Sequence, residues 1–482
     1  MAYLIFWPLV LWALLSRRPV ALFLFFAVIP FGSFSVVPIE ITGGLTILPR
    51  MVVGPVLALK ILMRPGGLAD SWAALTHIRR LGLLSCFMLI AVIVTLFAPR
   101  LFAGAVNVIG VSSTHVEVLQ PTGTNISQLI YLFASYVMVL ALFLAMKTAA
   151  DRQRMVLALL LGGAVAVVTG LLDVVTHGTQ ILAPFRTAAY AMLTGQEILG
   201  SQRIVGLMPE ASAYSAVCVF FGCSLYFLRD GITLNHRWSI LYMVIVAADL
   251  LLAAMATAST GLLGLGAFGL IVGLDWARRL VSGRTHAERA RVFRHFSLAG
   301  AALLVAAVFL LLRPDIFRPA VEMIDTAIFK KTTSDSFTER SMWNRVSLQA
   351  LVDTFGVGVG VGATRTSSWP VAVLSCTGGL GALAMGCFLA QRFLLSGAEL
   401  DEPDRRMLAG AKLALIVVLV PGAVSGTLVD FGPLNAALFA MTAALAVSHL
   451  PETPRGRRRG GLAASQRRSP LDRSRRGRLR AA

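Results

Sequence analysis

The chain has 482 residues, of which 57% are hydrophobic and only 14% are charged, and its mean hydropathy is +0.77. A soluble domain needs roughly a quarter of charged residues to cover its surface, so the composition excludes a set of water-soluble domains. It also excludes a disordered or nucleic-acid-binding protein, although the net charge is +19. We therefore predict an all-α, polytopic membrane protein.

The apolar residues come in blocks that are long enough to cross a bilayer core of about 30 Å. Lipid offers no partner for a free backbone N–H or C=O group, so each block is predicted to be a helix. We expect a bundle of about 12–13 spans of this length. The blocks cover residues 2–15, 19–36, 43–63, 82–98, 128–146, 155–175, 212–228, 239–256, 259–276, 297–312, 370–391, 408–427 and 434–450.

The loop charges predict the topology of these spans. The tail after Pro451 contains eleven arginines against Glu452 and Asp472, and we expect a disordered cytoplasmic segment that is drawn to anionic headgroups. It has no aromatic residues to stack bases, which argues against a nucleic-acid partner. Counted backwards from the tail, Lys and Arg concentrate in the loops on its side, as the positive-inside rule requires. We therefore predict a membrane domain over residues 1–450 and a basic tail over 451–482.

Two loops on the opposite, outer side are long, at residues 174–211 and 313–369. Long loops in compact proteins tend to be functional or disordered. These two carry apolar residues at helical spacing, so we expect short interfacial helices in them and a working face on the outer side. The five cysteines and the outer histidines lack metal-ligand spacing, and we expect neither a disulfide nor a metal cofactor. A signal peptide is not expected either, since no basic segment precedes the first span.

The loop at 313–369 contains the first group of candidate residues. Arg340 and Arg345 are five residues apart and are expected near one face of a short helix, and Arg365 follows a glycine-rich turn. Arginine is suited to bidentate recognition of phosphate oxygens. The alternative is local pairing with Glu339 and Asp353, or snorkelling to headgroups.

The glycine-rich turn alternates glycine and valine from Gly356 to Gly362. It lacks the Lys-Ser/Thr pair of a nucleotide-binding P-loop. Two interpretations remain open, a close contact between helices and a turn whose N–H groups hold an anion.

The loop at 174–211 ends with Arg203 and Glu210 at the start of the following span. Glu210 is either a helix-capping carboxylate or a group that orients or deprotonates a hydroxyl. The segment Ala258–Gly261 is predicted to be a structural turn. Asp249 is a lone carboxylate inside a span, which is a candidate functional group by default.

These outer segments resemble the O-antigen ligase and Wzy-type polysaccharide polymerase superfamily of bacterial envelopes, and within it the exopolysaccharide polymerases. The motifs run in the same order along the chain. They are Gln202-Arg203-x-x-Gly206-Leu207-x-Pro209-Glu210-x-Ser212-x-Tyr214, Ala258-Ser259-Thr260-Gly261-Leu262-Leu263-Gly264, Glu339-Arg340-x-x-Trp343-Asn344-x-Val346-x-x-x-Ala350, Phe355-Gly356-Val357-Gly358-Val359-Gly360 and Arg365-Thr366-Ser367-Ser368. Ligases carry a histidine in the region that corresponds to 363–372, and this sequence has none there.

The resemblance implies a membrane-embedded glycosyltransferase of the inner membrane, with its C-terminus in the cytoplasm. It implies polymerisation of repeat units carried on undecaprenyl pyrophosphate at the periplasmic face, with inversion at the sugar and without a nucleotide sugar. Arg203, Arg340 and Glu210 are then the expected catalytic residues. Arg345, Arg365, Ser367 and Ser368 are the expected substrate contacts. The lipid bilayer, a chain-length regulator and export machinery are the further partners to expect.

Two alternatives remain open. A ligase would pass finished glycan to a lipid or protein acceptor. A transporter of lipid-linked glycan would concentrate ionisable groups at the bilayer midplane, whereas the candidates here cluster in the outer loops.

Overall fold

We describe a computed structural model of the chain, over residues 2–113, 115–195, 197–198, 201–282, 335–397 and 399–446. The described residues all belong to one compact unit, Met1–Ser448. The predicted basic tail and the predicted span at 297–312 lie outside the described residues.

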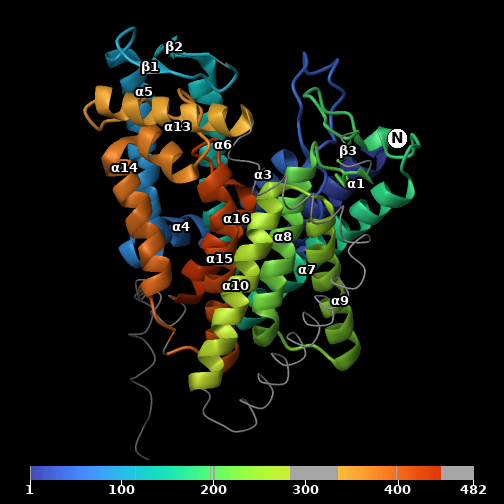
Figure 1. The fold of residues 1–482 in the computed structure, drawn as a ribbon. Coiled ribbons are helices and arrows are strands. Elements are labelled where there is room, and N and C mark those ends of the chain that lie inside the picture. Colours follow the sequence, from blue (N-terminus) through green and yellow to red (C-terminus); the bar gives the residue numbers. More distant parts are fainter. Residues whose placement is uncertain are drawn as a thin grey trace, which may run out of the picture. The chain divides into compact units, whose positions relative to one another are not determined.

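This compact unit is a helical bundle with two very short hairpins (Figure 1). The helices are α1 (Ala2–Leu15), α2 (Val20–Ala27), α3 (Pro49–Leu62), α4 (Gly67–Thr76), the π-helical turn η1 (Ile78–Gly82), α5 (Leu83–Leu101), α6 (Gly123–Ala145), α7 (Ala149–Val175), η2 (Ala183–Phe185), α8 (Ala211–Leu228), η3 (Arg229–Gly231), α9 (His236–Met255), α10 (Ser259–Ser282), α13 (Asp335–Asp353), α14 (Trp369–Leu394), α15 (Glu402–Ser425) and α16 (Gly432–Ala446). The strands are β1 (Asn107–Val108) and β2 (Glu117–Val118), which pair antiparallel, and β3 (Glu197–Ile198) and β4 (Ser201–Gln202), which do the same.

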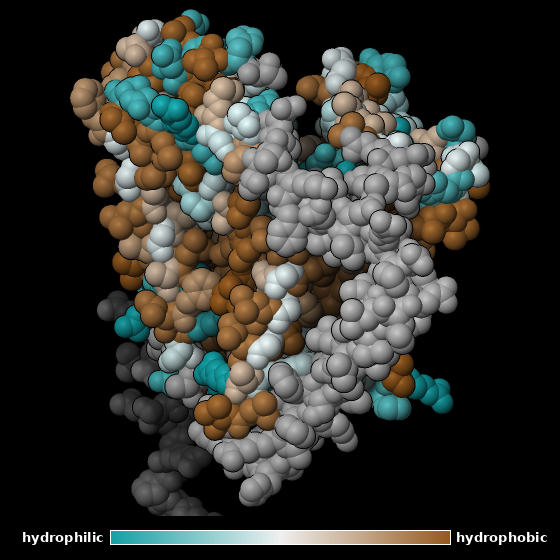
Figure 2. All heavy atoms as spheres, in the orientation of Figure 1, coloured by the Kyte–Doolittle hydropathy of each residue, from teal (hydrophilic) through white to brown (hydrophobic). Residues whose placement is uncertain are grey.

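Eight helices in the described part of the chain are long and apolar enough to cross a membrane, and a ninth span exists if α3 and α4 are counted together. Apolar side chains cover the middle of the bundle, and hydrophilic side chains gather toward its two ends (Figure 2). This arrangement is that of a multi-pass membrane protein, and the all-α polytopic prediction is confirmed.

Three of the predicted spans differ in the structure. The block at 19–36 is helical only over α2, because Pro30 cannot continue a helix and the chain after it joins the loops. The block at 43–63 becomes helical at Pro49 and is followed by a 102° bend to α4 at a left-handed Gly66. The last block is helical from Gly432, before its predicted start, and is described as far as Ala446.

Local sequence explains where the long helices begin. Thr122 and Thr148 form reciprocal capping boxes with Asn125 and Asp151, at the starts of α6 and α7. Asn235 caps α9 by accepting a hydrogen bond from the Trp238 amide at 3.0 Å. Such caps satisfy the free N–H groups of a first turn.

The loops that concern function lie at one end of the bundle, which we call the pocket end. There α5, α7, α9 and α15 end, and α6, α8, α10, α14 and α16 begin. Hydrogen bonds between loops hold it together, such as Arg365 N to Ile109 O at 2.8 Å. Hairpin β1–β2 and helix α13 lie at this end (Figure 1). A small apolar cluster packs beneath them, made of Val106, Val108, Leu119, Ala350, Val359 and Ala363.

Candidate functional site at the pocket end

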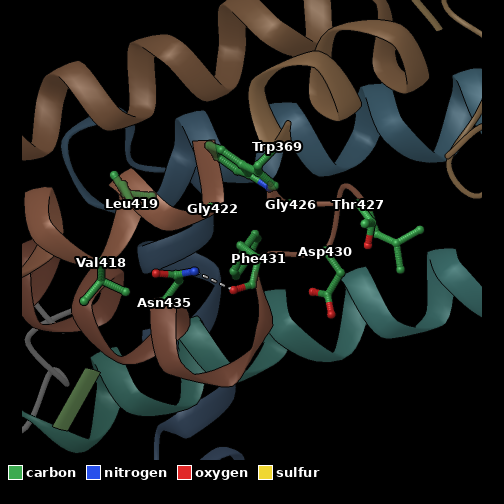
Figure 3. Close-up of a pocket in the computed structure, with 10 residues that line it drawn as sticks. Trp369, Val418, Leu419, Gly422, Gly426, Thr427, Asp430, Phe431 and Asn435 are labelled. Carbon is green, nitrogen blue, oxygen red and sulfur yellow. Dashed lines mark hydrogen bonds between the residues drawn. The ribbon is translucent and has the colours of Figure 1, made fainter. Parts of the chain in front are cut away.

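A pocket of about 230 Å³ opens between the first residue of α14, the end of α15 and the start of α16. Its apolar lining includes Val418 and Leu419 of α15 (Figure 3). Its polar lining includes Asp430 and Asn435, of which Asn435 lies beside Val418 and donates from Nδ2 to the Phe431 carbonyl at 2.8 Å. Its full lining is Trp369, Val418, Leu419, Gly422, Gly426, Thr427, Leu428, Asp430, Phe431 and Asn435.

Asp430 is the charged group of this pocket, in the short connection between α15 and α16. Burial raises the pKa of its carboxyl group above the ordinary value of 3.8, while hydrogen bonds from Ser135 and Gly432 and the charge of Arg50 oppose that rise. The Gly432 amide donates to Oδ1 at 3.0 Å. A carboxyl group with a raised pKa in a pocket is suited to accept a proton.

Three further elements bring polar groups to the same place. Arg50 stands at the start of α3, and its charge acts on Asp430, Tyr131 of α6 and Tyr190 of the 174–211 segment. Burial raises the pKa of the Tyr190 hydroxyl, and Arg50 opposes that rise. The Tyr190 hydroxyl donates to the Gly32 carbonyl, which fixes the ring. The pocket is therefore joined electrostatically to one of the two long loops singled out in the sequence.

The other long loop contacts the pocket directly through residues 366–369. The Thr366 amide donates to Thr427 O at 3.3 Å, and its hydroxyl donates to Gly426 O at 3.2 Å. The Trp369 indole N–H donates to Val429 O at 3.0 Å. These bonds fix the segment that carries the expected substrate contacts beside the pocket.

Arg365 lies immediately before this segment. Its guanidinium carbon is 3.9 Å from the centre of the Trp343 ring, a cation–π contact that links the loop to α13. Its carbonyl accepts a hydrogen bond from the Ser347 hydroxyl at 3.1 Å. Within the described residues its guanidinium N–H groups have no acceptor, so they are free to hold an anion.

The two serines that follow are positioned by their backbone. The Ser367 amide donates to Asn344 Oδ1 at 2.8 Å. Ser368 occupies the N-cap position of α14, but its hydroxyl makes no capping hydrogen bond. That hydroxyl remains available at the first turn of a helix, where N–H groups favour an anion.

Arg340 and Arg345 both lie on α13, a continuous helix of 19 residues. Five residues of regular helix separate two side chains by about 140°, so the two arginines do not share the face that the spacing suggested. Arg345 is exposed and Arg340 is half-buried. Asp353, an expected ion-pair partner, accepts instead from Gln349 Nε2 at 2.8 Å.

Arg203 and Glu210 form a second group, at the start of α8. The Arg203 guanidinium donates from Nε to Ala256 O and from Nη2 to Thr257 O, both at 3.3 Å. Burial lowers the pKa of Arg203, and the nearby Glu210 carboxylate opposes that shift. Glu210 is the N-cap residue of α8, yet its side chain makes no capping bond and accepts from the Ser212 hydroxyl instead. The N-cap position agrees with a carboxylate favoured by the helix dipole, and both interpretations of Glu210 stay open.

The segment that carries Arg203 is held by a buried acid that the sequence did not single out. Asp173, near the end of α7, accepts from the amides of Val205 and Gly206 at 2.9 and 3.0 Å and pairs with Arg186. Arg186 also donates to Gly206 O at 2.9 Å.

The glycine–valine segment 356–362 is a close contact between helices. Gly356, Gly358, Gly360 and Gly362 all have positive φ, and the amides of Val359 and Gly360 donate to Ser375 O and Cys376 O of α14. The Gly358 amide donates to Thr354 Oγ1 and the Val361 amide to Thr95 Oγ1. These N–H groups are already used within the protein, which rules out the interpretation as an anion-holding turn.

Two further sequence predictions, the turn at Ala258–Gly261 and the buried carboxylate of Asp249, can be compared with the structure. Ser259 begins α10, so the tight turn precedes it at Thr257, which has a positive φ. Ser259, Thr260 and Gly261 are thus helical and not part of a turn, and a methyl group at Gly261 would come 1.7 Å from Ser215 Oγ of α8. Asp249 is fully buried in α9, and in the part of the chain that the structure describes neither carboxylate oxygen has a hydrogen-bond partner.

Sequence reasoning missed Arg50, Tyr190 and Asp430. Arg50 was visible as a cation at the edge of an apolar block, the kind of residue that is rare in a span without a function. Asp430 lies in a short connection between two predicted spans, where no motif marks it.

The described residues contain no group of three or more His, Cys, Asp or Glu side chains placed to hold a metal ion. Comparison with models of known protein families and with curated proteins finds no match.

Proposed function

We propose that the protein is a glycosyltransferase that polymerises glycan repeat units carried on a polyprenyl pyrophosphate. The observation that carries the proposal is the mixed lining of the pocket, in which Val418 and Leu419 of a membrane-spanning helix occur together with the polar side chains of Asp430 and Asn435. Such a pocket suits a substrate whose head is polar and whose tail is a hydrocarbon.

The arginines at the pocket end supply the second support. In the proposed reaction an acceptor hydroxyl attacks the anomeric carbon, and the bond from that carbon to the pyrophosphate oxygen breaks with inversion. Negative charge then develops on the leaving pyrophosphate, where fixed cations stabilise the transition state. Arg365, whose N–H groups are free among the described residues, and Arg203 and Arg340 take this role, with Arg345 in support.

The acceptor hydroxyl must lose a proton. Asp430 has the raised pKa and the pocket position for that task. Glu210 is the second candidate, and its bond with the Ser212 hydroxyl shows that it can accept from a hydroxyl group. Ser367 and Ser368 are proposed to contact the sugar or phosphate beside Arg365.

The proposed setting is the bacterial inner membrane, with the pocket end at the periplasmic face and the C-terminus in the cytoplasm. A chain-length regulator and export machinery are the proposed protein partners.

The test is elongation of a lipid-linked repeat unit by the purified protein in liposomes, read as a ladder of glycan lengths. Arg203→Ala, Arg340→Ala, Arg365→Ala and Asp430→Asn are each expected to lower the rate about 10²–10³-fold, the loss typical for removing a transition-state contact or a general base. Arg406→Ala is the control, because Arg406 is an exposed residue near the start of α15 that pairs with Glu402. Unchanged ladders at equal protein levels would refute the residue assignments.

A deletion strain and the liposome assay together separate the ligase and the transporter from the polymerase. If a deletion strain accumulates free full-length polymer instead of single units, the protein is a ligase. If the liposomes translocate lipid-linked glycan without elongating it, the protein is a transporter.

A further inference from the structure

The end of the bundle opposite the pocket contains a cluster of four cations from three elements. Arg79 and Arg80 lie in the π-helical turn η1, Arg392 is near the end of α14, and Lys412 is in α15. Arg392 and Lys412 lie close enough for their charges to interact. The Arg392 side chain donates from Nη2 to Arg79 O at 3.2 Å, which joins α14 to η1.

Arg392 is 0% exposed and its Nη2 also donates to Gln391 Oε1, yet within the described residues its Nε and Nη1 have no hydrogen-bond partner. Its guanidinium carbon is 4.9 Å from the centre of the Phe388 ring, a contact that leaves those N–H groups unsatisfied. Arg80 Nε is buried without a partner as well. A buried charge is costly unless it is paired and hydrogen-bonded, and among the described residues three N–H-bearing atoms of Arg392 and Arg80 lack an acceptor.

In the described part of the chain, no carboxylate pairs with any of the four cations. The acids on the neighbouring helices are committed elsewhere, since Asp70 of α4 pairs with Lys147 and Glu402 of α15 pairs with Arg405 and Arg406. The Lys412 ammonium donates to Phe393 O and Leu395 O at 2.9 and 2.6 Å. These bonds close the end of α14 without neutralising any charge.

We propose that this cluster, Arg79, Arg80, Arg392 and Lys412, binds a phosphate-bearing anion. Arg80 and Lys412 are half-buried and therefore partly accessible, and we call these two residues the rim, whereas Arg392 is fully buried. Large apolar side chains beside the rim are exposed, with Ile78 at 61% and Leu394 at 82%, as acyl chains of a phospholipid would require. Basic pockets between membrane helices are known to bind anionic headgroups. The site lies away from the proposed glycan pocket and does not depend on its function.

The test uses the full chain in neutral detergent and measures the thermal unfolding midpoint during titration with one of three additives. These are phosphatidylglycerol, phosphatidylcholine at equal mole fraction, and inorganic phosphate. Phosphatidylglycerol is expected to raise the midpoint of the native protein at concentrations at least about tenfold lower than phosphatidylcholine, a difference equal to one factor of ten in affinity. A matching rise with inorganic phosphate identifies free phosphate as a ligand, and a rise with phosphatidylglycerol alone identifies a lipid headgroup.

The variants Arg392→Gln, Lys412→Gln and Arg80→Gln are each expected to raise the half-saturating concentration at least about tenfold. Arg406→Gln, at the same end but paired with Glu402, is the control. The basic tail is present in the wild-type protein and in every variant, so its own attraction to lipid contributes equally to the half-saturating concentrations that are compared. If Arg392→Gln does not fold, the two rim variants carry the test. Equal responses to both lipids without a response to phosphate, or unchanged titrations in the rim variants, would overturn the proposal.

Discussion

The ion pair between Arg152 of α7 and Asp404 of α15 offers a quantitative test of how the bundle is held together. Arg152 Nε donates to Asp404 Oδ1 at 2.9 Å, and Nη2 donates to Oδ2. The two side chains are 8% and 10% exposed. The pair is therefore bidentate and largely desolvated. It joins two spanning helices whose residues are far apart in the sequence.

Changing Asp404 to Asn leaves the Arg152 charge buried without its counter-charge. Removal of one partner of a buried pair costs about 3–5 kcal/mol. Replacing both residues, as Arg152→Met with Asp404→Leu, removes the two desolvated charges together and is expected to cost less than about 1 kcal/mol, because apolar replacement of a buried pair is often neutral. The double variant is thus expected to be more stable than the single one.

The assay is reversible denaturation of the purified protein in mixed micelles, followed by circular dichroism. Glu402→Gln on the same helix is the matched control. Glu402 pairs with Arg406 at 2.9 Å but is about half exposed, and such pairs contribute about 0–1 kcal/mol. A loss below about 1 kcal/mol for Asp404→Asn, no larger than that of the control, would show that burial in the bundle does not govern the strength of this pair.

Two further predictions concern the pocket end and the packing of α15. The pKa of Asp430 is raised above 3.8 by burial, so the folded wild-type protein binds more protons than the unfolded chain and loses stability as pH rises from about 4 through the raised pKa. Asp430→Asn lacks that loss, so its unfolding midpoint relative to wild type should rise from pH 4 to pH 8, and parallel pH curves would contradict the assignment. A methyl group at Gly410 would lie 2.1 Å from the Phe227 carbonyl oxygen of α8, so Gly410→Ala should destabilise the protein by about 1–3 kcal/mol. Gly386→Ala on α14, where the space is open, is the control and should be neutral or slightly stabilising in the same denaturation assay.

The fold was predictable where hydropathy alone decides it. Uniform apolar blocks such as those of α5, α7 and α8 became helices close to their predicted bounds, because lipid forces each backbone group to pair within its own segment. The prediction was weaker where backbone chemistry competes with hydropathy. Pro30 after α2 interrupts the apolar block 19–36, and the block 43–63 becomes helical only at Pro49, although a length criterion treats both blocks as continuous.

The candidate site was predictable only in part, because motifs report neighbours in sequence and not neighbours in space. The link between Trp343 and Arg365 crosses a glycine-rich segment, and its geometry depends on how that segment turns. The proximity of Arg50 and Asp430 joins the third and the last helical regions of the bundle. No spacing rule relates two residues so far apart, and neither has a motif of its own.

The four left-handed glycines between α13 and α14 have a mechanical consequence. A methyl group at Gly358 would lie 2.6 Å from the Gly378 amide nitrogen, and one at Gly378 would lie 2.2 Å from the Val357 carbonyl oxygen. The backbone of the glycine–valine segment 356–362 thus packs directly against the backbone of α14, and no flexible side chain lies between them. Helix α13 and the start of α14 should move as a rigid block, so any rearrangement during a working cycle must bend the chain elsewhere.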